Sequence, residues 1–272
     1  MSCEVVKTRW GSWAVRDHEA GEVMHPGPGP LIEAQELYVQ QSQLADRLTR
    51  TQASRFVVFD VGLGAGSNAL AAWQVSQACP PQTARLEIVS FENNLEAMHL
   101  ALKNNEAFGF VGEARLAAQT LLATGCYEND RTLWRLQHAD VFAGLAREHS
   151  RADVVFWDPF SPKANPNLWT VHAFTAARKA SGPEATLFTY SASTTVRVAL
   201  LLAGWHVGLG QATGTKATTT NAALRLQDVQ NPLGPAWLPR LDRPDVRLPV
   251  DAGEDAVART KSCEQFSQAA PP

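Results

Sequence analysis

The feature that most constrains the fold of this chain is a regular alternation of short apolar runs with longer segments of helical periodicity. Four such runs, RFVVFDVG, LEIVSFE, RADVVFWDPF and ATLFTYSA, are each followed by a helical pattern. Because FVVF, DVVFW and TLFTY are apolar at successive positions, the strands are expected to be covered on both faces, as in a parallel sheet. The sequence therefore predicts a doubly wound α/β fold with a mostly parallel sheet.

The two ends of the chain differ from this pattern. Residues 1–30 contain short β-prone pieces and PGPGP, which predict an N-terminal hairpin followed by a turn-rich loop. The α/β domain is expected over 31–226, opening with an amphipathic helix whose apolar residues include Ile32, Leu37, Leu44 and Leu48. It is expected to close with an antiparallel edge hairpin formed by WHVGLG and TTTNAALRL. Residues 227–272 are rich in Pro and charge and predict a flexible tail.

Composition excludes several classes of protein. No stretch approaches the roughly 20 apolar residues of a membrane span, the first ten residues lack a secretory core, and the four cysteines show no metal-ligand spacing. We therefore expect a cytoplasmic protein with neither membrane nor metal partners. Net charge is −3, but residues 151–225 hold seven Lys or Arg against three acids. A polyanion would be expected to meet this second half, although ordinary surface fluctuation explains the excess equally well.

A glycine-rich turn after the first predicted strand is the first candidate binding motif. It reads Asp60-Val-Gly62-Leu-Gly64-Ala-Gly66, and Asn68 lies in the first turn of the following helix. Glycines allow a ligand to approach the backbone, but the acid in front repels phosphate and can hold a cation. The spacing also differs from the G-x-G-x-x-G of most dinucleotide folds. The motif favours S-adenosylmethionine over NAD or FAD, or over a purely structural turn.

Two further carboxylates follow the next strands. Glu92 ends LEIVSFE, where an acid can accept hydrogen bonds from the two hydroxyls of a ribose. Asp140 in LQHADVF is placed to face an adenine. For both residues the alternative is capping of the next helix.

The run from Asp158 to Trp169, DPFSPKANPNLW, leaves the strand DVVFW. The carboxyl ends of parallel strands share one crevice, so Asp158 and the glycine turn are expected to converge there. Prolines stiffen the loop and fix where Phe160 and Asn165 point. An acid followed by Pro and an aromatic can receive an amine beside a stacked base. The alternative is a rigid connector with a capping Asp.

In order along the chain, DVGLGAGSNAL, SFE, FWDPFSPKANPNLW, LFTYSASTTVRVALLLAGW and GQATGTKATTT resemble the methyltransferase domain of the MnmC-type tRNA enzymes, over about residues 30–225. The family usually has Asp-Gly-Phe-Ala-Pro where this chain has Pro159 and Ser161.

The resemblance implies a Rossmann-like methyltransferase fold, S-adenosylmethionine as cofactor, tRNA as partner and a separate FAD-dependent oxidase acting earlier. The reaction would be N-methylation of the aminomethyl group at position 5 of a wobble 2-thiouridine. Asp158, Phe160 and Asn165 would then serve catalysis. Lys163, Trp169, Tyr190 and Lys216 would contact substrate or RNA. For Trp169 the alternative is packing among its apolar neighbours.

Two other functions stay open at this point. One is methylation of a different amine, on a metabolite, a protein or another RNA base. The other is a non-catalytic S-adenosylmethionine-binding module, which would need the glycine turn and Glu92 but not the run after Asp158.

Overall fold

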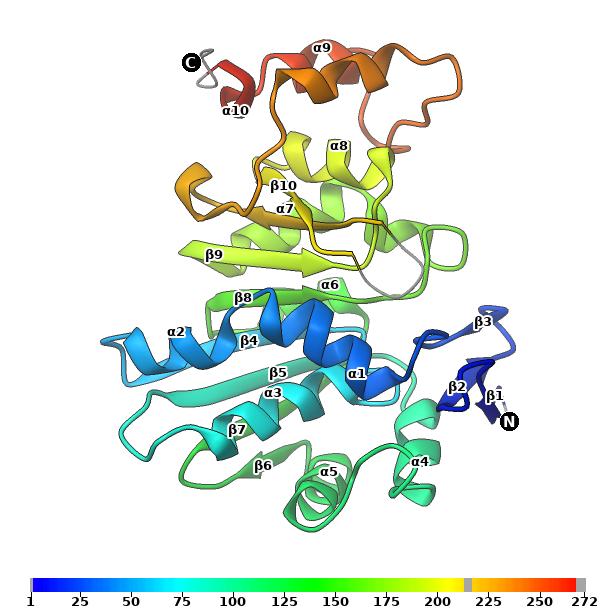
Figure 1. The fold of residues 1–272 in the computed structure, drawn as a ribbon, viewed down its shortest axis with the longest axis vertical. Helices are drawn as coiled ribbons and strands as arrows, with labels where there is room; N and C mark the ends of the chain where they lie inside the picture. Colours follow the sequence, from blue (N-terminus) through cyan, green and yellow to red (C-terminus); the bar gives the residue numbers. More distant parts are fainter. Residues whose placement is uncertain (1, 213–216, 268–272) are drawn as a thin grey trace.

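The computed structural model describes residues 2–212 and 217–267, and its centre is an eight-stranded sheet (Figure 1). The strand order is β10-β11-β9-β8-β4-β5-β7-β6. The strands span β4 (Arg55–Val61), β5 (Arg85–Glu92), β6 (Cys126–Glu128), β7 (Thr132–His138), β8 (Ala152–Trp157), β9 (Ser181–Thr189), β10 (His206–Gly210) and β11 (Thr219–Ala223).

The pairing pattern confirms the predicted sheet. Strands β7, β5, β4, β8 and β9 run parallel to one another, whereas β11 is antiparallel to both β9 and β10. The antiparallel hairpin thus lies at one edge, as predicted. At the other edge β6 pairs antiparallel with β7, and β6 was not predicted because three residues are too few for a periodic signal.

Helices cover both faces of this sheet (Figure 1). Phe56 and Val58 of β4 pack into one core with the first helices, and Val57 and Phe59 pack into the second core with α6, α7 and α8. Burial on both faces explains the unbroken apolar runs. The helices span α1 (Pro30–Ala34), η1 (Gln35–Gln40, a π-helix), α2 (Leu44–Arg50), α3 (Ser67–Ala78), α4 (Glu96–Lys103), α5 (Glu113–Thr124), α6 (Val141–Arg147), η2 (Pro166–Trp169), α7 (Val171–Lys179) and α8 (Thr194–Leu202).

The predicted opening helix is interrupted between residues 41 and 43. Gln43 adopts a left-handed φ of 54°, and the side-chain oxygen of Gln41 accepts a hydrogen bond from the Gln211 amide at 3.0 Å. Gln41 thus accepts a hydrogen bond from the backbone of a distant loop. Such a long-range contact cannot be predicted from the local periodicity of the sequence. Ile32, assigned to the apolar face, is 47% exposed, whereas Leu37, Leu44 and Leu48 are buried.

The prediction of a flexible C-terminal tail is wrong for the part that the structure describes. Residues 226–267 contain η3 (Leu226–Asp228), η4 (Pro235–Asp242), α9 (Ala256–Lys261) and α10 (Glu264–Ser267), and α9 packs against α8 (Figure 1). Trp237 and Phe266 are buried and stack with ring centroids 6.2 Å apart. The apolar residues of this segment are few and irregularly spaced among prolines, so they show no helical periodicity. In the structure they nevertheless complete the second core.

A small antiparallel sheet stands beside the carboxyl ends of the central strands. It contains β1 (Cys3–Lys7), β2 (Trp13–Asp17) and β3 (Glu22–Val23). The Ser2 amide donates to the Glu96 carboxylate of α4 at 3.0 Å, which fixes this sheet over the crevice where a ligand is expected. Within the described residues, no helix is both long and apolar enough to cross a membrane.

Candidate active site

The glycine turn between β4 and α3 is shaped so that side chains cannot be added. Gly62, Gly64 and Gly66 have φ values of 90°, 52° and 83°, a region that only glycine adopts without strain. A Cβ on Gly62 would lie 2.8 Å from the backbone oxygen of Asp158, and one on Gly66 would lie 2.7 Å from Met98 Sδ. The turn therefore brings β4 against the start of the loop after β8.

Asp60, expected to hold a cation, is completely buried behind this turn and does not line the cavity. Its Oδ2 accepts a hydrogen bond from Ser90 Oγ at 2.7 Å, and Trp134 Nε1 donates to the same hydroxyl at 3.0 Å. Burial raises the pKa of Asp60 to about 7 against the effect of the Ser90 hydrogen bond. Asp60 supports the turn from the interior.

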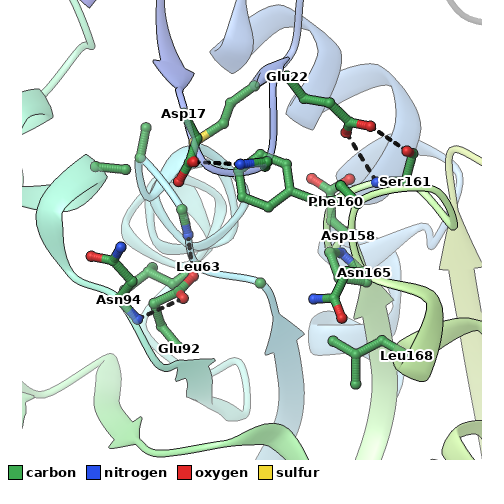
Figure 2. A pocket seen from close by; sticks show the side chains of 18 of the residues that line it. Asp17, Glu22, Leu63, Glu92, Asn94, Asp158, Phe160, Ser161, Asn165 and Leu168 are labelled. Atoms are coloured by element: carbon green, nitrogen blue, oxygen red, sulfur yellow. Dashed lines mark hydrogen bonds between the residues drawn. The ribbon is translucent and has the colours of Figure 1, made fainter. Parts of the chain in front are cut away.

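One cavity of about 1170 Å³ collects most of the predicted site (Figure 2). Gly62, Gly64, Glu92 and Asp140 line it from the central sheet, and the small N-terminal sheet covers it. In Figure 2, Glu92 lies across the pocket from Asp158, Phe160 and Asn165, with Asp17 and Glu22 above them. The cavity walls also include residues that lie more than 130 positions apart in the chain.

The charge of this cavity is one-sided. Its lining residues in the described part of the chain include one histidine and no Lys or Arg, but they include seven carboxylic acids, Asp17, Glu19, Glu22, Glu33, Glu92, Asp140 and Asp158. Such a site attracts cations and repels phosphate groups. These carboxylates suit a nucleoside that carries a positively charged sulfonium and ammonium, and they do not suit a dinucleotide with its phosphates.

Glu92 and Asp140 both line the cavity and both also satisfy backbone amides. Glu92 accepts from Gly64 N at 2.9 Å and from the amides of Asn93 and Asn94 on its other oxygen. Burial raises the pKa of Glu92, which these three hydrogen bonds oppose. Asp140 caps α6, accepting from Phe142 N at 2.9 Å. Asp140 therefore caps α6, as the alternative predicted, and it also lines the cavity.

Asp158 is the centre of a buried polar cluster. Asn68 Nδ2 donates to its Oδ2 at 2.7 Å, and His25 Nε2 lies 3.3 Å from the same oxygen. Burial raises the pKa of Asp158, and His25, Tyr38 and Asn68 oppose that rise. Asn68 does not reach the cavity. Its position is that of a residue that orients Asp158, rather than one that binds the cofactor.

His25 is a candidate that sequence reasoning missed. It lines the cavity, and its Nδ1 lies 3.6 Å from Glu33 while its Nε2 faces Asp158. Burial lowers its pKa, but the two carboxylates prevail and raise the pKa of His25 to about 9. A single histidine in GEVMHP carries no spacing signal, because its partners come from a helix and from a loop 133 positions later.

The loop after β8 presents some predicted residues and buries others. Phe160, Asn165 and Tyr190 line the cavity, and the Tyr190 hydroxyl donates to the Pro159 carbonyl at 3.0 Å. Trp169, predicted to contact substrate, is instead buried and donates from Nε1 to the Phe160 carbonyl at 2.8 Å. Its large ring fills the space beneath the loop and so holds Phe160 in place.

The two predicted basic contacts lie outside this cavity. Lys163 is exposed at the tip of the loop and does not line the pocket. Lys216 lies outside the described residues.

A contact that the sequence did not predict joins the loop after β8 to the N-terminal sheet. The Ser161 amide donates a hydrogen bond to the Glu22 carboxylate at 3.0 Å (Figure 2).

Comparison with known families assigns the class. Residues 114–225 match a family described as S-adenosyl-L-methionine-dependent methyltransferase. The fold, the acidic cavity and this match together identify the chain as a member of the S-adenosylmethionine-dependent methyltransferases, with that molecule as cofactor.

Within this class the resemblance to MnmC-type proteins is confirmed. The chain is 31% identical over 194 residues to the tRNA 5-methylaminomethyl-2-thiouridine biosynthesis bifunctional protein MnmC of Azoarcus sp., covering 69% of this chain and 30% of that protein. It is 29% identical over 225 residues to the MnmC of Methylibium petroleiphilum, covering 80% of this chain and 34% of that protein. The chain thus spans about a third of the length of these relatives.

A solved structure confirms the fold over nearly the whole chain. The crystal structure of MnmC2 from Aquifex aeolicus superposes with a TM-score of 0.72 at 24% sequence identity. The match covers 95% of this chain and 84% of the other.

Proposed function

We propose that this protein transfers a methyl group from S-adenosylmethionine to the aminomethyl nitrogen at position 5 of a wobble 2-thiouridine in tRNA. The observation that carries the proposal is the position of Asp158 in an acidic cavity directly beside the glycine turn. The names of the MnmC relatives, which concern 5-methylaminomethyl-2-thiouridine in tRNA, suggest the acceptor.

The cofactor would lie between the glycine turn and Glu92. Gly62 and Gly64 line the cavity without side chains, so the cofactor could approach the backbone of the turn closely. Glu92 lines the same cavity and would accept hydrogen bonds from the ribose hydroxyls. Asp140, which follows β7, would face the adenine of the cofactor. When bound, S-adenosylmethionine supplies an electrophilic methyl group on a sulfonium.

Asp158 would act on the acceptor amine. An aminomethyl group resembles the amine of Lys, so at neutral pH on the order of one molecule in a thousand is the neutral nucleophile. Burial raises the pKa of Asp158, which makes its carboxylate a stronger base towards the ammonium proton. Asp158 would therefore bind the ammonium, accept its proton and hold the amine in line with the methyl group.

The aromatic and amide groups around Asp158 would orient the base. Phe160 lines the cavity where a pyrimidine would stack, and Asn165 offers an amide to its polar edge. Tyr190 closes the same wall. Lys163 is exposed where an RNA phosphate could be neutralised, and Lys216 is proposed for the same role.

The proposal implies other components of the modification. The aminomethyl acceptor must be produced by a separate enzyme, for which we propose an FAD-dependent oxidase acting upstream. A tRNA substrate would place the reaction in the cytoplasm. Methylation of another amine would use the same cavity, so the acceptor must be tested directly.

The test is methyl transfer in a purified system. The protein is incubated with S-adenosylmethionine and tRNA that carries 5-aminomethyl-2-thiouridine, and the digested nucleosides are measured by mass spectrometry. We expect conversion to the 5-methylaminomethyl nucleoside, and accumulation of the aminomethyl form in cells that lack the gene. An unmethylated tRNA together with a normal cellular nucleoside profile would overturn the tRNA assignment.

A further inference from the structure

The tip of the N-terminal hairpin exposes two tryptophans in basic surroundings. Among the described residues, six large apolar side chains are exposed, and two of them, Trp10 and Trp13, are aromatic. Their side chains are 55% and 42% exposed. The guanidinium of Arg9 lies 4.9 Å from the Trp10 ring centroid, and Lys7 Nζ lies 5.6 Å from that of Trp13. Exposed rings of this size are unusual on a surface that has no partner.

A hydrogen-bonded turn carries Trp10 and leads into Trp13, the first residue of β2. The Thr8 amide donates to the Ser12 carbonyl at 2.8 Å, and the Thr8 and Ser12 hydroxyls lie 2.7 Å apart. The Trp10 amide donates to Thr8 Oγ1 at 3.2 Å. The rings are therefore presented on a rigid platform, which lowers the entropy lost when a partner binds.

The charge of the platform selects an anionic partner. Residues 5–16 contain three basic side chains and no acid. The third of these, Arg16, is already paired with Glu4 at 3.1 Å. Within the part of the chain that the structure describes, Lys7 and Arg9 form no ion pair, so they carry the uncompensated positive charge of the tip. Aromatic rings interleaved with cations are the groups that stack unpaired bases and neutralise phosphates.

A shallow cleft of about 460 Å³ adjoins the platform. Trp13 forms one wall, and Lys103, Asn104 and Asn105 at the end of α4 form another. Glu106 is the single acid among the residues that line it. The cleft therefore combines a ring face, a cation and amides beside each other.

The platform is continuous with the active site. Cys3 and Asp17 pair at the base of the same hairpin and line the cavity, while Lys7 and Trp13 pair near its tip. At about 3.4 Å per residue, Trp13 lies about 14 Å from Asp17 along the strand. A small amine in the cavity would not reach the tip, whereas a polynucleotide with one base in the cavity would.

We propose that the hairpin tip formed by Lys7, Arg9, Trp10 and Trp13 is an RNA-binding platform that stacks unpaired nucleotides flanking the methylated one. The inference rests on the proposed function, since it assumes an RNA acceptor. It assigns RNA contacts to the N-terminal sheet, in addition to the basic second half of the chain.

The test compares tRNA with a free nucleoside as acceptor. The double variant Trp10→Ala/Trp13→Ala should raise the KM for tRNA and its Kd about 10-fold while kcat and the KM for the 5-aminomethyl-2-thiouridine nucleoside stay within twofold. Leu116→Ala, which removes an exposed side chain on α5, is the matched control and should change neither. Affinity for S-adenosylmethionine and the thermal midpoint verify that the sheet remains folded.

A second pair of variants separates the charge from the rings. Arg9→Gln should lower the slope of log Kd against log salt by about 1, whereas Arg16→Gln, which removes a paired charge, should change it less. Equal tRNA affinity in wild type and the double variant would overturn the inference and leave the proposed function intact. A wild type that methylates neither acceptor would instead overturn the proposed function. Loss of binding to anionic vesicles, with tRNA binding unchanged, would assign the tip to a membrane surface and also overturn it.

Discussion

At the scale of single residues, one carboxylate gathers groups from three other parts of the chain. Asp158 is in contact with Asn68 of α3 and His25 of the N-terminal segment, and it lies beside Gly62 of the turn after β4. The sequence identified Asp158, Asn68 and Gly62 from motifs. His25 was not identifiable, because its importance comes only from the two acids that the fold brings to it.

The first prediction concerns Asp158→Asn. The amide keeps the size of the side chain and can still accept the Asn68 hydrogen bond, but it cannot take a proton from the ammonium. We expect kcat to fall at least 100-fold while the Kd for S-adenosylmethionine stays within threefold. Steady-state kinetics and calorimetry measure the two quantities, with Asp46→Asn on α2 as an exposed control. Turnover within threefold of wild type would remove Asp158 from the reaction.

The second prediction concerns the pH dependence of stability at His25. Its pKa is raised to about 9 from an ordinary value near 6.5, so the folded protein favours the protonated form. The resulting stabilisation is complete below pH 6.5 and is lost as pH rises towards 9. The difference in unfolding free energy between wild type and His25→Gln should therefore shrink across this range, as measured by urea titrations at several pH values. A difference that is constant with pH would show that Asp158 and Glu33 do not hold the proton.

At the scale of elements, strands were predictable where they are buried on both faces. FVVF and DVVFW became part of β4 and β8 because their apolar side chains are buried in the cores on both faces of the sheet. The helix expected over 31–50 was less predictable, since it is interrupted at Gln43, which adopts a left-handed φ of 54°. Beside this break the Gln41 side chain accepts a hydrogen bond from a loop 170 positions away. Elements defined by local burial follow from the sequence, and interruptions made by distant partners do not.

The third prediction compares two glycines with similar backbone angles. Gly62 and Gly125 have φ values of 90° and 78°, but a Cβ on Gly62 meets the Asp158 backbone at 2.8 Å, whereas one on Gly125 meets nothing within 4 Å. Both Ala variants carry the left-handed strain of about 1 kcal/mol. We expect only Gly62→Ala to weaken S-adenosylmethionine binding more than 10-fold in calorimetry. Equal affinities in the two variants would mean that the close approach of the turn to Asp158 is not needed for the cofactor.

At the scale of the whole molecule, both ends of the chain complete the central domain. The N-terminal sheet covers the cavity and is joined to the loop after β8 through Glu22 and Ser161. The C-terminal segment caps the edge strand β10, where Gln265 accepts from Val207 N and donates to the Val207 carbonyl, both at 2.7 Å. An edge strand covered in this way is protected from pairing with other chains.

The fourth prediction tests that the C-terminal segment is part of the folded core. Phe266 is 7% exposed and stacks on Trp237, so Phe266→Ala should destabilise the fold by about 3 kcal/mol, or roughly 5 °C or more in thermal midpoint. Val250→Ala, at a side chain that is 88% exposed, is the control and should leave the midpoint unchanged. Identical midpoints for the two variants would indicate that the segment adds no stability.

The sequence by itself determined the parallel sheet, the edge hairpin, the glycine turn and the placement of Glu92 and Asp158 at strand ends. These features are local, because strand burial, left-handed turns and the carboxyl edge of a parallel sheet each leave a pattern in neighbouring residues. Only the tertiary structure decided the acidity of the cavity, the pairing of His25 with Asp158 and the packing of residues 227–267. Those properties arise from contacts between residues far apart in the chain, and a contact of that kind leaves no period in the sequence.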